Sequence, residues 1–355
     1  MISGLKVLVA SGLAAYDDSW DDHKNRSLSA EILYVISRDK KVSRIFSKPV
    51  EMCPAQGNKV FGGSYNGRCI VGVGKGVYEF READRHWKKI KSTNKPREYS
   101  SSCCIDQKCL VVVGGWDGSG KSSAEIFHLP EAFSPSNSKF YGSSFVPSFL
   151  GAISMSTKQR GQGRCKWTKC TSKAPVSLED GTPAQVWGHT ITHIGINKLL
   201  LVGGRAISQR PYRRQTTRCV LEGEITEDLT DIKWRRLRSI SMARFGHFAF
   251  KLNKFIYIGG GAEYGAEDIL CCEKYDIEAE SWSVCQHSLP YHLYKASAVV
   301  DVNESFALII GGLKRSSEAS NEVLLFTEEG GFEVLENSQL QTKRYGHVSL
   351  RMCIT

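Results

Sequence analysis

The chain has 355 residues, of which 41% are apolar and 24% are charged, and its 33 glycines and 7 tryptophans are spread along the sequence. This composition excludes a disordered or low-complexity chain, and no apolar run approaches the roughly 18 residues that a membrane span needs. The 47 Lys and Arg exceed the 37 Asp and Glu, which gives a formal net charge of +10. Such a surplus favours an anionic partner, such as nucleic acid, an anionic membrane surface or an acidic protein.

The N-terminal residues 1–15 have the apolar character of a short signal peptide, but Lys6 interrupts the apolar stretch. Residues 5–12 also have the same form as residues 110–115, an apolar run that ends in small residues. We therefore expect a strand at the N-terminus, with a signal peptide as the alternative.

The twelve cysteines do not have the spacing of a zinc site. Cys103-Cys104 and Cys271-Cys272 are adjacent pairs in strand-like runs, and no Cys-x-x-Cys pair exists. Neighbouring residues of a strand point to opposite faces, so buried free thiols are the expected state. Free thiols indicate a reducing compartment.

An apolar strand closed by glycines recurs along the chain. Its copies are residues 60–63, 110–115, 199–204, 255–261 and 306–312. Some copies follow a Gly-His pair, as at Gly188-His189, Gly246-His247 and Gly346-His347, and some precede a tryptophan, as at Trp167, Trp234 and Trp282. This pattern resembles the kelch repeat, and residues 244–285 are its most complete copy. The resemblance implies four-stranded units packed radially around a central channel, which is an all-β propeller fold.

The repeats predict one domain, residues 1–355, with six blades. Blades 2 to 6 use residues 57–90, 97–170, 186–237, 244–285 and 295–335. Blade 1 combines the strands at 5–12, 30–36 and 42–46 with the C-terminal strand at 344–350, so that the two ends of the chain close the ring. In blade 2, residues 68–74 resemble the second strand, which would place Gly62-Gly63 near the first. The Ser- and Gly-rich residues 130–164 are expected to form a long insertion in blade 3.

The sequence offers no enzyme active site, and we expect no catalytic residue, cofactor, metal or small-molecule substrate. The glycine-rich residues 72–76 lack the spacing of a phosphate-binding loop. His189 and His193 lie four residues apart on a predicted strand, unlike the helical pair that binds zinc. The acidic residues of the 17–22 loop indicate a solvated loop or a patch for a basic partner, with a metal site as the alternative. No spacing in the sequence indicates the set of ligands that a copper oxidase needs.

Basic residues gather in clusters with few or no acidic residues. A solvated face is the usual explanation of one such cluster, but several clusters that include Tyr212 and Trp167 favour contact with a phosphate backbone. Strand directions predict that residues 91–97, 205–218 and 235–238 share one rim, and that the cluster at 158–173 begins on the opposite rim. The predicted DNA- or partner-binding residues are Lys88, Lys89, Lys91, Lys95, Arg97, Arg160, Arg164, Lys166, Lys169, Lys173, Arg205, Arg210, Arg213, Arg214, Arg218, Arg235 and Arg236.

Residues 169–217 resemble more than a generic kelch repeat. Their Cys170-Thr171, Gly188-His189, Gly203-Gly204-Arg205 and Thr216-Thr217 are similar to the accessory propeller subunit of RAG-type recombinases and transposases. The resemblance implies a non-catalytic nuclear subunit that binds the catalytic recombinase and supports engagement of the DNA backbone. The plant homeodomain finger of the vertebrate subunit has no counterpart in this sequence. The alternative is a nuclear or cytoplasmic kelch adaptor that presents substrates to a ubiquitin ligase or binds actin.

Overall fold

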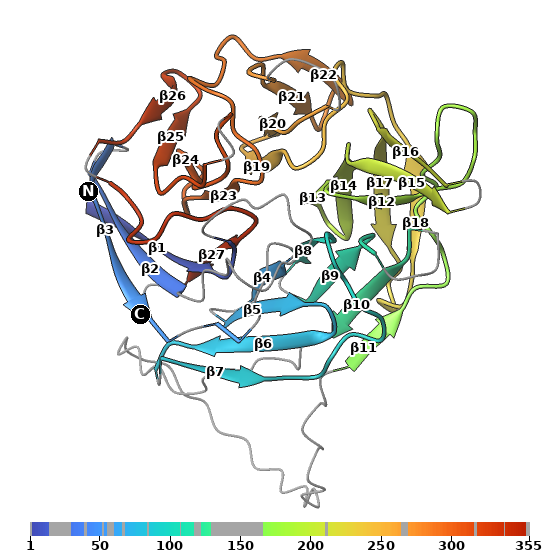
Figure 1. Ribbon diagram of the computed structural model, residues 1–355, viewed down its shortest axis with the longest axis horizontal. Helices are drawn as coiled ribbons and strands as arrows, with labels where there is room; N and C mark the ends of the chain where they lie inside the picture. Colours follow the sequence, from blue (N-terminus) through green and yellow to red (C-terminus); the bar gives the residue numbers. More distant parts are fainter. Residues whose placement is uncertain are drawn as a thin grey trace, which may run out of the picture.

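The computed structural model describes residues 2–13, 30–38, 41–51, 53–54, 60–65, 68–83, 85–106, 108–116, 122–128, 166–209, 212–263, 269–315, 318–336 and 338–352. These residues form β-strands and no helix, and the strands make seven antiparallel sheets (Figure 1). Within these ranges there is accordingly no helix long and apolar enough to cross a membrane. The predicted insertion at 130–164 and the acidic loop at 17–22 lie outside the described residues.

Six of the sheets in the described ranges have four strands each, and we name them S1 to S6. S1 contains β27 (Val348–Met352), β1 (Ile2–Ala10), β2 (Ala30–Arg38) and β3 (Lys41–Val50). S2 contains β4 (Phe61–Tyr65), β5 (Arg68–Val73), β6 (Gly76–Arg81) and β7 (His86–Lys89). S3 contains β8 (Ser101–Ile105), β9 (Cys109–Val113), β10 (Ala124–His128) and β11 (Lys166–Lys169).

The remaining four-stranded sheets follow in chain order. S4 contains β13 (Thr190–Gly195), β14 (Lys198–Val202), β17 (Val220–Ile225) and β18 (Ile232–Arg236). S5 contains β19 (Phe248–Leu252), β20 (Phe255–Gly259), β21 (Glu273–Asp276) and β22 (Ser281–Val284). S6 contains β23 (Ser297–Val300), β24 (Ala307–Ile310), β25 (Val323–Thr327) and β26 (Gly331–Val334). In each of S2 to S6 the strands pair in the order in which they occur in the chain.

The seventh sheet, the small sheet, has three strands: β12 (Gln185–Trp187), β15 (Arg205–Gln209) and β16 (Tyr212–Thr216). Its central strand β15 pairs with both others, so β16 is an edge strand. β15 and β16 lie in the connection between β14 and β17. The predicted basic loop at 205–218 is therefore largely a hairpin.

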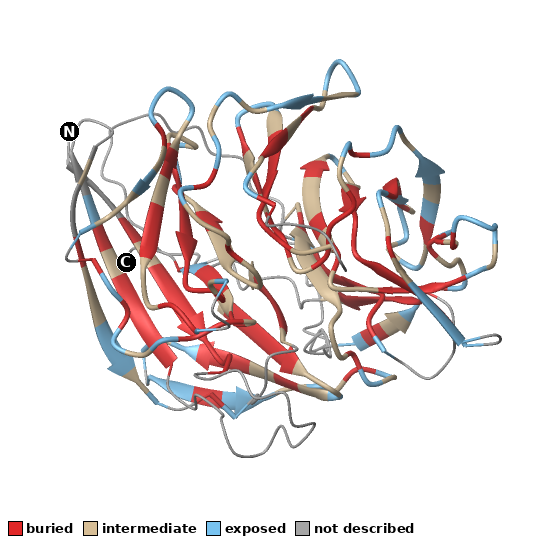
Figure 2. Ribbon diagram, turned by 45° about the horizontal axis from the view of Figure 1, so that its top comes forward, coloured by how far each residue is buried: buried red, intermediate tan, exposed pale blue. Residues whose placement is uncertain are grey.

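The first strands of S1 to S6 lie side by side around the middle of the molecule (Figure 1). β4, β8, β13, β19, β23 and β27 contact one another in that order, and β27 also contacts β4. The second strands, such as β9 (CLVVV) and β24 (ALII), are buried along their length. The outermost strands β7 and β18 are largely exposed (Figure 2). A short, continuously apolar strand between polar outer strands is typical of a sheet that is covered on both faces.

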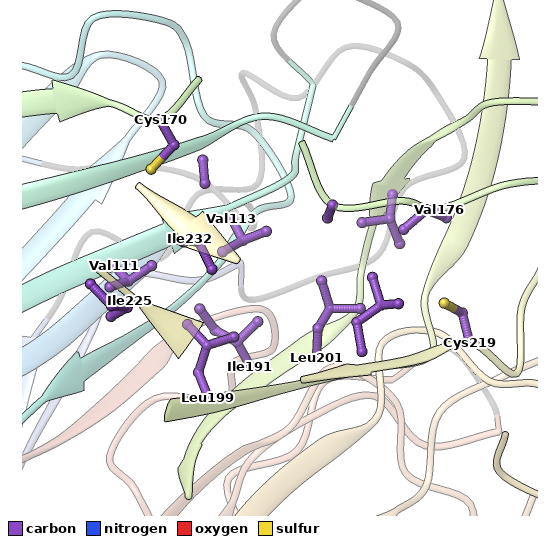
Figure 3. Close-up of a cluster of buried hydrophobic side chains, with 14 of the residues drawn as sticks. Val111, Val113, Cys170, Val176, Ile191, Leu199, Leu201, Cys219, Ile225 and Ile232 are labelled. Carbon is purple, nitrogen blue, oxygen red and sulfur yellow. The ribbon is translucent and has the colours of Figure 1, made fainter. Parts of the chain in front are cut away.

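Hydrophobic clusters fill the spaces between neighbouring sheets. One lies between S3 and S4, where Val111 and Val113 of β9 face Leu199 and Leu201 of β14 (Figure 3). Other clusters join S1 with S2, S2 with S3, S4 with S5, S5 with S6, and S6 with S1. Each fully buried aliphatic side chain contributes about 1.5–3 kcal/mol through removal of its apolar surface from water, so these clusters hold adjacent sheets together.

Fourth-strand tryptophans take part in these clusters to different degrees. Trp167 of β11 is buried, packs on Phe127 with ring centroids 4.8 Å apart, and donates from Nε1 to the Lys91 carbonyl at 2.7 Å. Trp234 and Trp282 pack against the S3–S4 and S4–S5 clusters but are only half-buried. One side of each of these fourth strands faces solvent, which leaves part of both tryptophans exposed.

The predicted Gly-His pairs mark the entry of the chain into a first strand. Gly188, Gly246 and Gly346 have φ values of 64°, 65° and 62°, a left-handed conformation in which a Cβ atom is unfavourable. In this conformation Gly246 N donates to Gly188 O at 2.7 Å, and Gly346 N donates to Lys295 O at 2.9 Å. The glycines therefore allow backbone hydrogen bonds between successive sheets.

The glycines of residues 60–63 have a different role from the strand-closing pairs. Gly62 and Gly63 lie within β4, the first strand of S2, and residues 68–73 form the second strand β5. The prediction that Gly62-Gly63 close a second strand, as in the other copies, is wrong for S2. The alternative assignment, made from residues 68–74, agrees with the strands.

The two ends of the chain pair in S1. β27 runs antiparallel to β1, with Leu350 opposite Leu8 and Ser349 opposite Val9. Just beyond the paired strands, Leu13 and Tyr345 exchange backbone hydrogen bonds of 3.0 Å. The C-terminal strand therefore supplies the first strand of the sheet that contains the N-terminus.

Candidate anion-binding surfaces

Arg97, one of the predicted partner-binding residues, is fully buried. Its guanidinium donates to Glu125 Oε1 from Nε at 3.1 Å and from Nη2 at 2.9 Å, and to the Gly114 and Ser123 carbonyls. These bonds compensate its charge inside the molecule. The placement of Arg97 on a binding surface is therefore corrected: this arginine serves the fold.

Four other predicted arginines line one groove of about 840 Å³ beside the small sheet. Arg205 comes from β15, Arg214 from β16, Arg218 from the segment after β16, and Arg236 from the end of β18. They belong to the clusters at 205–218 and 235–238, which the strand directions predict to share a rim. The groove therefore concentrates positive charge from elements that are separate in the sequence.

Arg205 lies at the floor of this groove, with only 8% of its surface exposed. Its Cζ atom is 5.6 Å from the centroid of the Trp187 ring and 5.2 Å from that of Phe245. β12 places Trp187 directly opposite Arg205 in the small sheet. A guanidinium over an aromatic face is stabilised by the ring quadrupole, so these rings position the Arg205 side chain.

Hydroxyl groups make up much of the remaining lining. They belong to Ser177, Thr216, Thr217, Ser239 and Ser241. Thr216 is 92% buried, since its relative exposure is 8%, and its Oγ1 has no hydrogen-bond partner among the described residues. Two carboxylates, Glu179 and Glu263, also line the groove. The lining thus combines guanidinium and hydroxyl groups, which can donate hydrogen bonds to an anion, with the two carboxylates of Glu179 and Glu263, which would repel one.

The neighbouring arginines are partly compensated by acidic residues. Arg213 pairs with Asp180, with 2.6 Å between Nη1 and Oδ2. Arg235 pairs with Glu280 at 2.6 Å and with Glu222 at 3.1 Å, and its hydrogen bonds to these two carboxylates raise the Arg235 pKa. Arg210 lies outside the described residues. Arg213 and Arg235 therefore offer less uncompensated charge than their positions in the sequence indicate.

Exposed lysines form a second basic surface on the outer strands of S2 and S3. This lysine patch consists of Lys88 and Lys89 of β7, Lys91 just after it, and Lys166 and Lys169 of β11. The hydrogen bond from Trp167 to the Lys91 carbonyl brings the two outer strands together. Within the described ranges, no acidic group lies within ion-pair distance of these five ammonium groups.

The other predicted lysines and arginines lie elsewhere. Lys95 and Lys173 are half-buried, and Lys173 Nζ donates to the Cys170 carbonyl at 3.4 Å. Arg160 and Arg164 fall outside the described residues. Sequence reasoning did not find the groove residues Ser177, Ser239 and Ser241, because no charge or repeat signal distinguishes these serines from ordinary loop residues.

The described residues include no group of three His, Cys, Asp or Glu side chains that could hold a metal ion. Their cysteines are free thiols, and burial raises the pKa of both Cys109 and Cys170 to about 12. These two thiols remain protonated at neutral pH and are poor nucleophiles. The chemistry available at the groove and the lysine patch is therefore ionic and hydrogen-bonded recognition of an anionic group.

A comparison with protein-family models gave no match to this chain, and a comparison with curated proteins gave no significant match.

Proposed function

We propose that the chain is a single-domain, six-bladed kelch-type β-propeller closed by pairing of its N- and C-terminal strands. S1 to S6 would be the blades. The unbroken order of contacts among their first strands, and the clusters between every pair of neighbours, support this proposal. The small sheet would be an addition to blade 4.

We propose further that this propeller is a non-catalytic subunit of a RAG-like DNA recombinase or transposase, which acts in the nucleus. It would bind the catalytic subunit and help to hold DNA through the phosphate backbone. The observation that carries the DNA contact is the lysine patch, whose five exposed ammonium groups form no ion pair within the described ranges. These strands offer flexible ammonium groups but no helix or β-ribbon that could enter a DNA groove. Such ammonium groups contact phosphates and do not distinguish bases.

A salt-dependence experiment tests this function. The variant changes Lys88, Lys89, Lys166 and Lys169 to Gln, and binding to two unrelated DNA duplexes is measured by fluorescence anisotropy across a salt series. We expect both duplexes to bind more weakly and to a similar extent. The slope of log K against log salt should become shallower by about one unit for each phosphate that the variant no longer neutralises.

A matched control changes three lysines that already form ion pairs, Lys251, Lys254 and Lys343, to Gln. This control should leave the salt slope close to that of the wild type. The same two variants are then compared in the complex recovered with the catalytic partner from native extract, because the assembled complex is the form in which DNA would be captured. An unchanged slope in the patch variant, in both settings, would contradict the proposed DNA contact.

The second candidate function is a kelch adaptor that binds a protein partner, either for a ubiquitin ligase or on actin. The groove favours it, because Glu179 and Glu263 interrupt the positive lining and a continuous polyanion would meet repulsion there. A pull-down from native extract with and without nuclease separates the two functions. A partner that is retained after nuclease treatment, from a chain that captures no DNA, favours the adaptor.

A further inference from the structure

We propose that the free edge of β16 binds an extended acidic peptide, which would add a fourth strand to the small sheet beside the four groove arginines. The inference rests on the propeller acting as a binding subunit, which both proposed functions share. It concerns the groove and not the lysine patch, so the two can fail separately.

The orientation of β16 is the first support. β16 is an edge strand of the small sheet, and its consecutive residues 214–216 all line the groove, as do residues 217–219 that follow it. Side chains of a strand alternate between its two faces, so consecutive residues line one cavity when the edge of the strand faces that cavity. An exposed strand edge offers backbone donors and acceptors to another extended chain.

The length of the hollow is the second support. A neighbouring groove of about 510 Å³ shares Leu178, Glu179, Arg214 and Gln215 with the first and extends the lining to Arg213. Together the two grooves follow the chain from Arg213 to Arg218. Residues 213–216 of this stretch belong to β16, and at about 3.3 Å per residue their edge accommodates about four residues of an extended peptide.

The charges identify the chemistry of the peptide. Guanidinium groups bind carboxylates through paired, charge-assisted hydrogen bonds. Arg214, Arg218 and Arg236 surround the groove, and Arg205 forms its floor. Thr216, whose buried hydroxyl has no partner among the described residues, also lines this space. Alternate Asp or Glu side chains of an added strand would meet these groups.

The same features disfavour a DNA duplex in the groove. Arg205 is 8% exposed and lies at the floor, whereas the phosphates of a duplex lie on a convex surface. Glu179 and Glu263 would face some of those phosphates at close range. A peptide avoids this repulsion by placing uncharged residues opposite the two carboxylates, and Leu178 and Met242 supply apolar lining for them.

The test measures binding of a fluorescein-labelled octapeptide of alternating Val and Glu to the full chain by fluorescence anisotropy. Three further probes accompany it: the same peptide N-methylated at alternate residues, a peptide of the same composition with all Glu residues adjacent, and a short DNA duplex. We expect the alternating peptide to bind. The N-methylated peptide should bind about tenfold more weakly, because N-methylation removes the backbone donors.

Two variants locate the site. Arg218→Gln combined with Arg236→Gln should weaken the alternating peptide about tenfold. The control, Lys233→Gln combined with Arg238→Gln, removes two exposed charges from the same region that do not line the groove, and should leave the affinity unchanged. Unchanged melting temperatures show that both variants remain folded.

Two outcomes would overturn the proposal. Equal binding of the N-methylated peptide would mean that charge alone attracts the peptide and that β16 gains no strand. Displacement of the peptide by the duplex, with the same loss of duplex affinity in the groove variant, would assign the groove to nucleic acid. Neither outcome bears on the lysine-patch variant, whose salt slope is measured independently.

Discussion

Three arginines of this basic chain are buried inside the fold, where glutamates neutralise them. Arg97, Arg244 and Arg344 each precede the first strand of a sheet, and each pairs with a glutamate on the third strand of that sheet: Glu125, Glu273 and Glu31. All three arginines have no exposed surface. The same ion pair therefore recurs in S3, S5 and S1 as part of the repeat.

Breaking one of these pairs should be costly. We expect Glu273→Gln to lower the free energy of unfolding by about 3–5 kcal/mol, because Arg244 keeps a buried charge that has lost its partner. The comparison is Lys251→Gln, which removes a pair with Glu304 that is 3.6 Å long and partly exposed, and should change stability by about 1 kcal/mol or less. Urea unfolding measures both. Equal effects would mean that the Arg244–Glu273 pair is not a buried support of the fold.

The histidines of the Gly-His pairs should make stability depend on pH. Burial lowers the pKa of His189 to about 3, from an ordinary value of 6.5, and the pKa values of His247 and His347 are also well below it. The unfolded chain therefore binds a proton at these histidines more readily than the folded chain does. The free energy of unfolding is greatest above pH 6.5, where the histidines are neutral in both states, and it decreases as the pH falls toward 3. For His189 alone this loss is about 2 kcal/mol at pH 5.

The variant His189→Ala tests this pH dependence. Ala296 follows the left-handed Lys295 as His189 follows Gly188, so the repeat already accepts alanine at this position. We expect the difference in unfolding free energy between pH 7.5 and pH 5.0 to shrink by about 2 kcal/mol in the variant. Urea unfolding at the two pH values measures this difference. The packing that the alanine substitution removes is lost at both pH values, so it cancels in the difference. The same difference in variant and wild type would show that His189 does not resist protonation.

At the scale of strands, the sequence predicts those elements whose signal is local. The repeat pattern of residues 244–285 predicts four strands, and β19 to β22 lie within them. Their apolar runs, closing glycines and entering Gly-His pair all reflect constraints within a few residues. The C-terminal strand could also be predicted, because the N-terminal sheet lacks a first strand from its own part of the chain and residues 344–350 have the form of one.

The small sheet could not be predicted in this way. Residues 209–212 (Gln-Arg-Pro-Tyr) lack the Asn-Gly or Gly-containing turn that indicates a hairpin. β15 depends on β12, which lies before the intervening strands β13 and β14. The prediction that Arg97 lies on the surface was wrong for a related reason: its partner Glu125 is two strands away. Charge clusters in a sequence therefore locate basic segments, but tertiary pairing decides which of their side chains remain available.

At the scale of the whole molecule, the pairing of β1 with β27 joins residues that are far apart in the sequence. In the proposed ring this sheet is the one blade built from both ends of the chain. Arg344 adds a second connection, because its guanidinium bonds Glu31 of β2 and the Ser11 carbonyl. The cluster between S1 and S2 depends on the C-terminal strand for part of its apolar surface, including Leu350 and Met352.

Removal of residues 344–355 should therefore affect the whole molecule. The truncation exposes the edge of β1, an unpaired strand edge that promotes aggregation, and leaves Glu31 buried without Arg344. We expect a lower melting temperature and association into larger species, measured by circular dichroism and by light scattering after size-exclusion chromatography. Arg344→Ala in the full-length chain separates the two causes: it should lower the melting temperature while the protein stays monomeric, because β27 still covers β1. A truncated chain that remains monomeric with an unchanged melting temperature would contradict the proposed closure of the ring.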